Sequence, residues 1–442
     1  MPIRFTSRRA RLLDALWLLA LAAYIVAGVP LASFHGDEAM QVYMSEDYAV
    51  AFFDHDLARL TAGPPYNIDA EAQLRILNGS VNRYAIGLLW HLAGYSRADL
   101  PPAPGWDWGL NYDSNAAAGY RPPDALLHLA RLPSALFLAA SAAAMFGLGW
   151  QFGGRPLAYA ASALYTLNPV ILLNGRRAMM EGSLLLFGLL AVLLAAHISR
   201  RRAQDKLPGP LWWLALAAAA GLALASKHTG AIFAAAAFGW VALAELLRRR
   251  PRALPPAALR LIASGALALG LFVALSPALW SSPLARLRDL LDVRAELVDI
   301  QVQADPAAPM PLARRVEFIV TQPFIAPPMH FEAGGWTSFA PISAEIARYM
   351  QSPLSGWQFG PIVGTALTLL AVFGVVALAA PGLRGSVPSD QAAGLLLWAG
   401  LAAAALLANP LPWQRYYLPL IPPAALLAVA GAAAALRWRS RL

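Results

Sequence analysis

Uninterrupted apolar runs of about 20 residues recur along the whole chain, and they constrain its fold more than any other feature. A helix needs a run of about this length to cross a bilayer, and within the bilayer each backbone N–H and C=O must be paired inside the protein. Of the 442 residues, 58% are hydrophobic and only 13% are charged. Soluble domains carry roughly a quarter charged residues. The composition therefore excludes a soluble fold and predicts an all-α polytopic membrane protein.

About ten runs are long and apolar enough to be predicted as transmembrane helices, although the ends of each run are defined only to within several residues. The predicted spans are Leu12–Phe34, Leu126–Gly149, Leu157–Leu173, Gly182–His197, Leu211–Ala225, Gly230–Leu247, Leu261–Leu279, Phe359–Ala379, Ala392–Ala408 and Tyr417–Leu436.

The basic residues predict which side of the membrane each connection occupies. If both termini are cytoplasmic, just over half of the 34 basic residues fall in short inner segments, as the positive-inside rule expects. The formal charge of +9 then reports topology and not a nucleic-acid partner. The main basic segments are Arg4–Arg11, Arg200–Lys206, Arg248–Arg260 and Arg437–Arg441.

This orientation divides the chain into five parts. Residues 1–34 are the cytoplasmic N-terminus and first span, 35–125 a large outer loop, and 126–279 the second to seventh spans. Residues 280–358 form a second outer loop, and 359–442 the last three spans with a cytoplasmic C-terminus. The first run also fits a signal peptide, but it is long for one and its cleavage site near Pro30 is poor. We therefore predict that it is a retained span.

The most informative polar segment is His35-Gly36-Asp37-Glu38, directly after the first span. Adjacent carboxylates beside a span are costly unless they are solvated, paired or used. Glu38 also begins a predicted amphipathic helix at the membrane interface, so the acids fit an N-terminal helix cap as well as they fit an active site.

Further acids and cations are predicted to converge on the same outer face. Arg131 opens the second span, and Lys227, one of only two lysines, ends the fifth. Arg415 opens the last span. Arg177 and Glu181 are four residues apart, which predicts that they share one helix face. A snorkelling anchor and a simple ion pair are the alternatives for Lys227 and for the Arg177–Glu181 pair.

Several short motifs follow one another in order along the chain. They are the acidic pair, Arg131-Leu132-Pro133-Ser134, the Arg177/Glu181 turn, Gly221–Lys227, Ser276–Pro283 and Arg415-Tyr416-Tyr417-Leu418-Pro419. This ordered set resembles the GT-C glycosyltransferases, in the branch of protein O-mannosyltransferases and the aminoarabinose transferase (glycosyltransferase family 39-like). No single motif is specific, but the order extends across nearly the whole chain.

The resemblance implies inverting transfer of a sugar from a polyprenyl-phosphate donor to a lipid, glycan or protein acceptor at the extracytoplasmic face. It implies catalytic roles for Asp37, Glu38 and Glu181, with Asp37 as base and Glu38 orienting it or capping its helix. Donor-phosphate binding would fall to the cations, and no metal or other cofactor is implied. The cations are Lys227, Arg415, Arg131 and Arg177. The richness in arginine and alanine favours a bacterial inner membrane, with the site facing the periplasm.

Two features depart from the family pattern. The His-Pro-Pro-Leu-like segment of the first outer loop is replaced by Asn82-Arg83-Tyr84-Ala85, and Glu181 stands where aspartate is commoner. Asp54-His55-Asp56 resembles the metal motif of oligosaccharyltransferases, but carboxylates two apart on a helix do not face each other. His330 and Glu332 could join a divalent ion, yet we expect them to be a solvated loop pair.

Most aromatic residues of the outer loops are expected to form an interfacial belt, with a few stacking on sugars. They include Trp90, Trp106, Trp108, Tyr112, Tyr120, Trp280, Trp336 and Trp357. A lipid flippase or transporter, or a non-catalytic envelope-assembly protein, remains the alternative to an enzyme. A transporter predicts charged residues at mid-span, which are scarce here.

Overall fold

The computed structural model describes residues 8–68, 70–204, 206, 208–248, 254–332 and 334–439. Within these residues the chain is helical, with no strand. Arg4, Arg249, Arg250, Arg252 and Arg441 of the basic inner segments lie outside the described residues.

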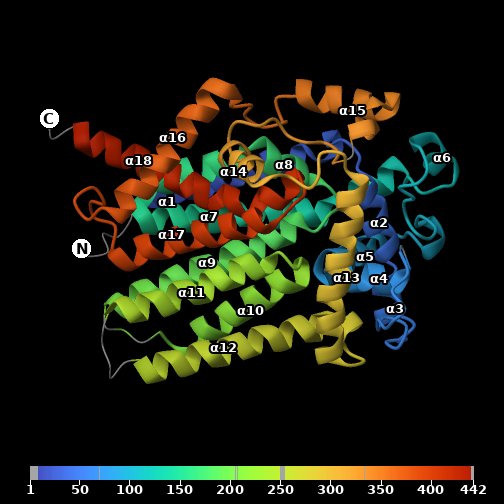
Figure 1. The fold of residues 1–442 in the computed structure, drawn as a ribbon, viewed down its shortest axis with the longest axis horizontal. Helices are drawn as coiled ribbons and strands as arrows, with labels where there is room; N and C mark the ends of the chain where they lie inside the picture. The colour runs from blue at the N-terminus through green and yellow to red at the C-terminus, as the bar shows by residue number, and fades with distance from the viewer. Residues whose placement is uncertain are drawn as a thin grey trace.

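The long apolar helices run side by side as one bundle, horizontal in Figure 1. Eight described helices are long and apolar enough to cross a membrane, and the shorter apolar α10 packs among them. The bundle comprises α1 (Arg8–Ala27), α7 (Asp124–Thr166), α9 (Glu181–Ala203), α10 (Pro210–Ser226), α11 (Gly230–Arg248), α12 (Leu254–Leu275), α16 (Gly360–Ala379), α17 (Ser389–Ala408) and α18 (Ile421–Arg439). The chain is thus an all-α integral membrane protein, which confirms the predicted fold class.

The second and third predicted spans are the two arms of α7. The helix bends sharply at Gly153 and Gly154, and Gly154 has a positive φ of 73° that favours glycine. The arms lie against each other, because the Ser141 and Tyr165 hydroxyls are 2.7 Å apart across them. After α7, Asn168 caps the short α8 (Pro169–Arg176) by accepting hydrogen bonds from the next two free backbone N–H groups.

Close helix contacts fix how the ends of the spans meet. A Cβ on Gly182, at the start of α9, would lie 2.0 Å from the Ser134 carbonyl oxygen of α7. Only glycine fits there, and such small residues let two helix backbones approach directly. This contact holds Glu181 beside α7.

Short helices cover one end of the bundle, on the right in Figure 1, while α1 begins and α18 ends at the opposite end. The short helices there are α2 (Gly36–Met44), α3 (Asp47–Phe52), α4 (Glu71–Leu77), α5 (Ser80–Leu92), α6 (Tyr112–Ala117) and α15 (Ala340–Gln351), while α14 (Leu312–Thr321) lies nearer the middle of the view. Three-residue to seven-residue 3-10 turns join them, including η1 (Val29–Leu31), η2 (Arg97–Asp99), η4 (Pro277–Leu279), η5 (Gly334–Ser338) and η6 (Gln414–Leu420).

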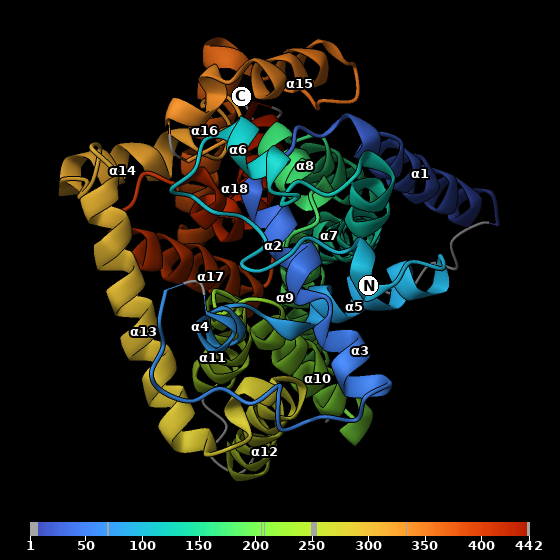
Figure 2. The ribbon, with the colours of Figure 1, turned by 90° about the vertical axis from the view of Figure 1, so that its right-hand side faces the viewer.

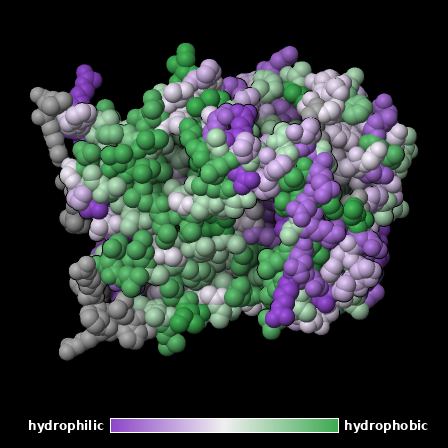
Figure 3. Space-filling view, viewed as in Figure 1, coloured by the Kyte–Doolittle hydropathy of each residue, from purple (hydrophilic) through white to green (hydrophobic). Residues whose placement is uncertain are grey.

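The long helix α13 (Pro283–Ala304) crosses this covered end and stands upright against the horizontal spans in Figure 1. Hydrophobic surface extends over the spans in Figure 3, and hydrophilic surface gathers along α13 and over the covered end. A polar end on an apolar bundle is the arrangement expected where a membrane protein meets water.

Candidate active site

The acidic pair lies on the first turn of α2, at the covered end of the bundle seen face-on in Figure 2. His35 caps the helix. Its Nδ1 accepts the Asp37 backbone N–H at 3.1 Å, and the His35 N–H donates to Glu38 Oε2 at 3.0 Å. The cap and the acidic pair are therefore one unit, which explains why the sequence fits both interpretations.

Glu38 is sealed inside the protein. Its carboxylate accepts two hydrogen bonds from Arg131, at 2.7 and 2.9 Å, and one from the Ala178 N–H at 2.8 Å. Burial alone would raise the pKa of Glu38, but the charge and hydrogen bonds of Arg131 outweigh it and hold that pKa below the usual value. Arg131, only 1% exposed, is the counter-ion of a buried carboxylate and not a free cation.

The predicted Arg177–Glu181 pair on one helix face is wrong. α8 ends before Arg177, whose backbone is extended, and α9 begins only at Glu181, so the spacing of an uninterrupted helix does not apply. Arg177 is buried and donates to the Ser33 carbonyl at 3.0 Å and to the His330 carbonyl at 2.8 Å. It supplies donors to backbone groups that burial would otherwise leave unpaired.

Asp37 is the more open of the two acids, with its side chain 25% exposed. It forms an ion pair with Arg415, which η6 brings from the far end of the sequence. Burial raises the pKa of Asp37, but the charge of Arg415 beside it outweighs burial, so the net pKa is lower than usual. Asp37 is therefore ionised at neutral pH.

Glu332 completes this cluster, and the expectation of a solvated loop pair is wrong. Its carboxylate is 2.7 Å from His35 Nε2 and 3.1 Å from Arg415 Nε, and its side chain is only 11% exposed. His330 is buried as well, with Nδ1 2.7 Å from the Ser33 hydroxyl, and burial lowers its pKa to about 3. The second loop thus folds inward onto the first, where Glu332 and Asp37 share Arg415.

Lys227 follows the last residue of α10 and points at Glu181, with Nζ 2.5 Å from Oε1. The second oxygen of Glu181 is buried and has no hydrogen-bond partner among the described residues. Gly79 packs on the corner formed by Lys227 and Glu181, where a Cβ on this glycine would lie 2.0 Å from the Ser226 carbonyl oxygen. An unpaired buried carboxylate oxygen is costly and indicates a place for a hydrogen-bond donor.

Lys227 and a further cation, Arg294, face the ring of Tyr416, the residue after Arg415. Lys227 Nζ lies 5.9 Å and Arg294 Cζ 5.5 Å from its centroid, and Arg294 also donates to the Tyr416 hydroxyl at 2.7 Å. Burial and then the charges of Arg294 and Lys227 lower the pKa of the adjacent His228 to about 4. No carboxylate among the described residues pairs with Arg294, so this corner carries positive charge that the protein itself does not neutralise.

A groove of about 440 Å³ opens beside Arg294, between α13 and the end of α17. Its wall is mostly apolar, with Asp299 and Asn409 among the polar members. The lining comprises Leu291, Arg294, Ala295, Val298, Asp299, Ala405, Ala408, Asn409 and Pro410.

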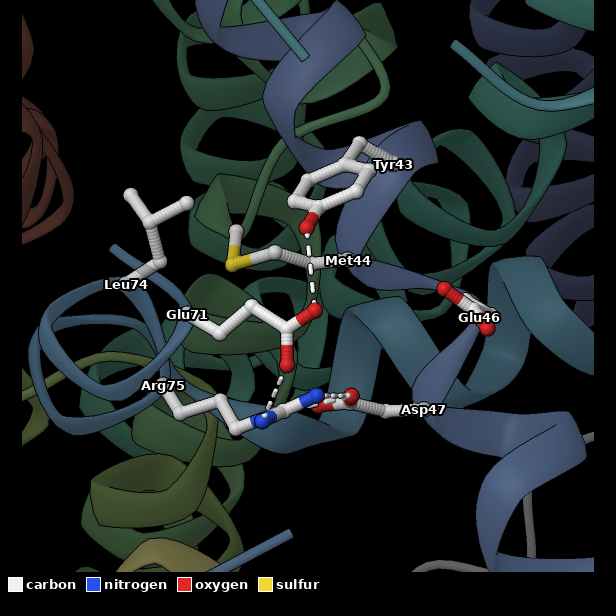
Figure 4. Close-up of a pocket in the computed structure, with 7 residues that line it drawn as sticks. All are labelled: Tyr43, Met44, Glu46, Asp47, Glu71, Leu74 and Arg75. Carbon is white, nitrogen blue, oxygen red and sulfur yellow. Dashed lines mark hydrogen bonds and ion pairs between the residues drawn. The ribbon is translucent and has the colours of Figure 1, made fainter. Parts of the chain in front are cut away.

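A second pocket, shown in Figure 4, is a closed ionic network and not a substrate site. Asp47 is buried and bound by Arg75 at 2.9 Å, and the Tyr43 hydroxyl donates to Glu71 at 3.2 Å. The departing Asn82–Ala85 segment belongs here, because Arg83 lies 3.4 Å from Asp47. The space holds about 10 Å³, too little for a sugar. The lining residues are Tyr43, Met44, Glu46, Asp47, Glu71, Leu74 and Arg75.

The two carboxylates of the Asp54-His55-Asp56 segment have separate partners. Asp54 forms an ion pair with Arg97, and Asp56 accepts the Arg59 backbone N–H at 3.2 Å. In the part of the chain that the structure describes, no group of three histidine, aspartate or glutamate side chains is arranged to hold a metal ion.

The belt interpretation is wrong for several aromatic residues. Trp106 is fully buried, with ring contacts to Phe34 at 5.1 Å and to Trp336 at 5.5 Å. Trp90 is also buried and donates to the Ser45 hydroxyl at 2.9 Å. The loops fold over a core of their own, which aromatic side chains fill.

Comparison with known proteins agrees with this architecture. Residues 107–275 match the family model described as dolichyl-phosphate-mannose-protein mannosyltransferase (PMT). The oligosaccharyltransferase AglB of Archaeoglobus fulgidus, solved with an inhibitory peptide and a dolichol-phosphate, superposes over 97% of this chain and 52% of its own, with a TM-score of 0.52 and 14% identity. The chain has the GT-C superfamily fold.

Two further structures are similar at lower TM-scores. ArnT from Cupriavidus metallidurans, bound to undecaprenyl phosphate, matches 95% of this chain and 60% of its own, at 13% identity and a TM-score of 0.49. The Saccharomyces cerevisiae Pmt1-Pmt2 complex, bound to its sugar donor, matches 61% of this chain and 34% of its own, at 15% identity and a TM-score of 0.43. The chain thus spans between about a third and three fifths of these structures' chains. No curated protein matches it significantly.

The GT-C resemblance inferred from the motifs is therefore confirmed at the level of the fold. The structure brings Asp37, Glu181, Lys227 and Arg415 to one corner of the covered end, and it removes Arg131 and Arg177 into internal ion pairs and hydrogen bonds. Sequence reasoning missed Glu332 as a site residue and did not consider Arg294.

Proposed function

We propose that this chain is an inverting glycosyltransferase that moves a sugar from a polyprenyl-phosphate donor to an acceptor at the extracytoplasmic face of a bacterial inner membrane. The observation that carries the proposal is the corner itself. A partly open carboxylate, Asp37, lies beside Arg415, close to Lys227 and Arg294, on a GT-C scaffold. Basic last turns of α9, α11 and α18 at the opposite end support a cytoplasmic side there.

Asp37 serves as the general base. It accepts the proton of an acceptor hydroxyl, whose oxygen attacks the anomeric carbon in line and forms the new C–O bond. The bond from that carbon to the phosphate oxygen breaks, and its electron pair remains on the lipid phosphate. In-line attack inverts the anomeric configuration, and Glu38 keeps the Asp37 helix in place through its cap contacts.

Lys227, Arg415 and Arg294 stabilise the charge of the leaving phosphate. Fixed cations in a partly desolvated corner are worth more than in water, because they need no reorganisation when charge develops. Arg131 and Arg177, the other predicted phosphate ligands, act instead as supports, since each is only 1% exposed and its guanidinium group is paired inside the protein. A phosphate leaving group of this kind requires no metal in the proposed step.

The unpaired oxygen of Glu181 binds a hydroxyl of the transferred sugar. A hydroxyl donated to this oxygen would satisfy it, and a sugar presents several. The groove between α13 and α17 takes the isoprenoid chain, with Arg294 at its edge next to the phosphate. In this arrangement the loops 35–125 and 280–358 are the extracytoplasmic parts, and the acceptor is a lipid, a glycan or a protein.

The test is transfer by the full chain reconstituted in nanodiscs. Radiolabelled undecaprenyl-phosphate mannose is the first donor probe, because of the family model matched, with bacterial envelope extract as acceptor. We expect label to move into the extract with wild type and not with Asp37→Asn, while the variant binds undecaprenyl phosphate at least as tightly as wild type. Transfer that is unchanged in Asp37→Asn would refute the catalytic assignment, and a wild type inactive with every polyprenyl-phosphate sugar would refute the function.

A further inference from the structure

Four side chains close a ring around the proposed base. Asp37 pairs with Arg415, Arg415 with Glu332 at 3.1 Å, and Glu332 with His35 at 2.7 Å. His35 returns to Asp37 by accepting its backbone N–H at 3.1 Å. His35 and Asp37 come from the first loop, Glu332 from the second, and Arg415 from the start of the last span.

The ring fixes the hydrogen position on His35. Its Nδ1 accepts a hydrogen bond from a backbone N–H, so Nδ1 carries no hydrogen of its own. Nε2 then carries it and donates to Glu332. Glu332 thus holds the imidazole in the tautomer and orientation that cap the Asp37 helix.

Glu332 is itself firmly held. Gln414, adjacent to Arg415, accepts the Met329 backbone N–H at 2.5 Å and donates to the Pro327 carbonyl at 2.9 Å, which ties the approach to Glu332 onto η6. Burial raises the pKa of Glu332, but the charge of Arg415 and the contact with His35 outweigh it and hold the pKa far below the usual value. Glu332 is therefore a charged, fixed partner of Arg415.

One guanidinium shared by two carboxylates leaves the ring with an excess of negative charge. A donor phosphate arriving at Arg415 competes with Asp37 for the terminal nitrogens of the guanidinium, whereas Glu332 contacts Nε. Arg415 can therefore turn from Asp37 to the phosphate while its inner edge stays anchored. Asp37, relieved of its cation and facing Glu332, becomes a stronger base at the moment the donor is in place.

We propose that Glu332 is a positioning residue, which holds His35 and Arg415 around Asp37 and retains Arg415 when the donor phosphate displaces the Asp37 carboxylate. This inference rests on the proposed function. For the substrates it implies an order of events, in which the donor binds before the acceptor hydroxyl is deprotonated.

The charges that face this ring are few. Asp37 faces Arg415, His35 and Glu332, and Glu332 also faces Arg177. Tyr416 and Glu181 also act electrostatically on Arg415. Because the Glu332 charge raises the pKa of Asp37, removing it makes Asp37 a weaker base.

The experiment compares Glu332→Gln with Glu345→Gln in the full chain, using kcat and donor KM across pH. Glu345 is a matched control. It also docks the second loop on the first, through the Phe34 N–H at 2.7 Å and Arg121 at 3.1 Å, but contacts no ring residue. In Glu332→Gln we expect kcat to fall about tenfold, equivalent to one pKa unit, and its acid limb to move to lower pH. Donor KM should not rise, since the amide oxygen of this variant can still accept from Arg415 Nε and the terminal nitrogens stay available to the phosphate.

Glu332→Asp should recover part of kcat, and Glu345→Gln should keep the wild-type pH profile. A merely structural Glu332 would lower the melting temperature and raise donor KM without moving the acid limb, and that result would overturn the proposal. So would a wild-type kcat in Glu332→Gln. Failure of wild type to transfer any sugar would count against the proposed function instead.

Binding of undecaprenyl phosphate, measured by native mass spectrometry, supplies a readout without turnover. Weaker binding by Glu332→Gln also contradicts the inference.

Discussion

Asp37 and Glu38 are neighbours in sequence and lie in opposite environments. Glu38 is fully buried, with four hydrogen bonds, two from Arg131 and two from backbone N–H groups. Asp37 is a quarter exposed and shares one arginine with Glu332. The difference shows how one acidic pair can separate two tasks. The sealed side supports the fold, and the open side is available for chemistry.

The substitution Asp37→Asn is the strongest test of the difference between Asp37 and Glu38. Loss of the base should lower the transfer rate by about a thousandfold, within the range of general base catalysis. The melting temperature should stay close to wild type, because an amide can keep a hydrogen bond to Arg415. A large drop in melting temperature together with the rate would show that Asp37 is a structural residue like Glu38.

Glu38→Ala tests the sealed side. Removing one member of a buried ion pair leaves Arg131 charged and unpaired, which costs about 3–5 kcal/mol. Denaturation in detergent micelles measures the change. Arg155, which pairs with Asp14 at the partly exposed opposite end, gives a control in Arg155→Ala, where we expect a clearly smaller loss.

On the open side, Lys227→Met and Arg294→Gln should each weaken binding of undecaprenyl phosphate about tenfold, as expected for one charge-assisted contact. Arg286→Gln is the control on α13, since Arg286 is neutralised by Asp289 at 2.9 Å. Equal affinities in all three variants would show that the donor phosphate does not bind beside Lys227 and Arg294.

The smallest effect concerns pH. The pKa of Asp37 is lowered in the free protein by Arg415, and donor binding should relieve this. The pH profile of kcat reports the complex, and that of kcat/KM reports the free enzyme. We expect the acid limb of kcat to lie at a higher pH than the acid limb of kcat/KM, by up to about one pH unit. Coincident limbs would contradict the link between donor binding and Asp37.

Stability depends on pH for the same groups. Asp37 and Glu332 both have lowered pKa values, so their contribution to stability is present above the unfolded pKa and is lost as pH falls through the folded values.

The spans could be predicted from sequence because bilayer thickness dictates the length of each apolar run. The sequence also predicts that several charged residues lie at the same end of the bundle, because each of them stands beside a span. These residues are Asp37, Glu181, Lys227 and Arg415. Their roles as catalytic or binding groups stay predictions.

The partners of the charged residues could not be predicted in the same way. Arg131 and Arg177 look like Arg415 in sequence, and only tertiary contacts separate the three. Arg131 meets Glu38 across 93 positions, and Glu332 meets His35 across 297. No local periodicity encodes such distant pairs. The inward fold of Glu332 also contradicts the ordinary expectation that loop charges are solvated.

The long reach of the Asp37–Arg415 contact sets an order of assembly. Chains are synthesised from the N-terminus, and early segments fold first. Glu38 can find Arg131 once the second span is made, whereas Asp37 must wait across 378 positions for Arg415. On this order, a nascent chain secures its acidic helix early and completes the Asp37–Arg415 pair only when the final span is made, so the proposed transfer requires the whole chain.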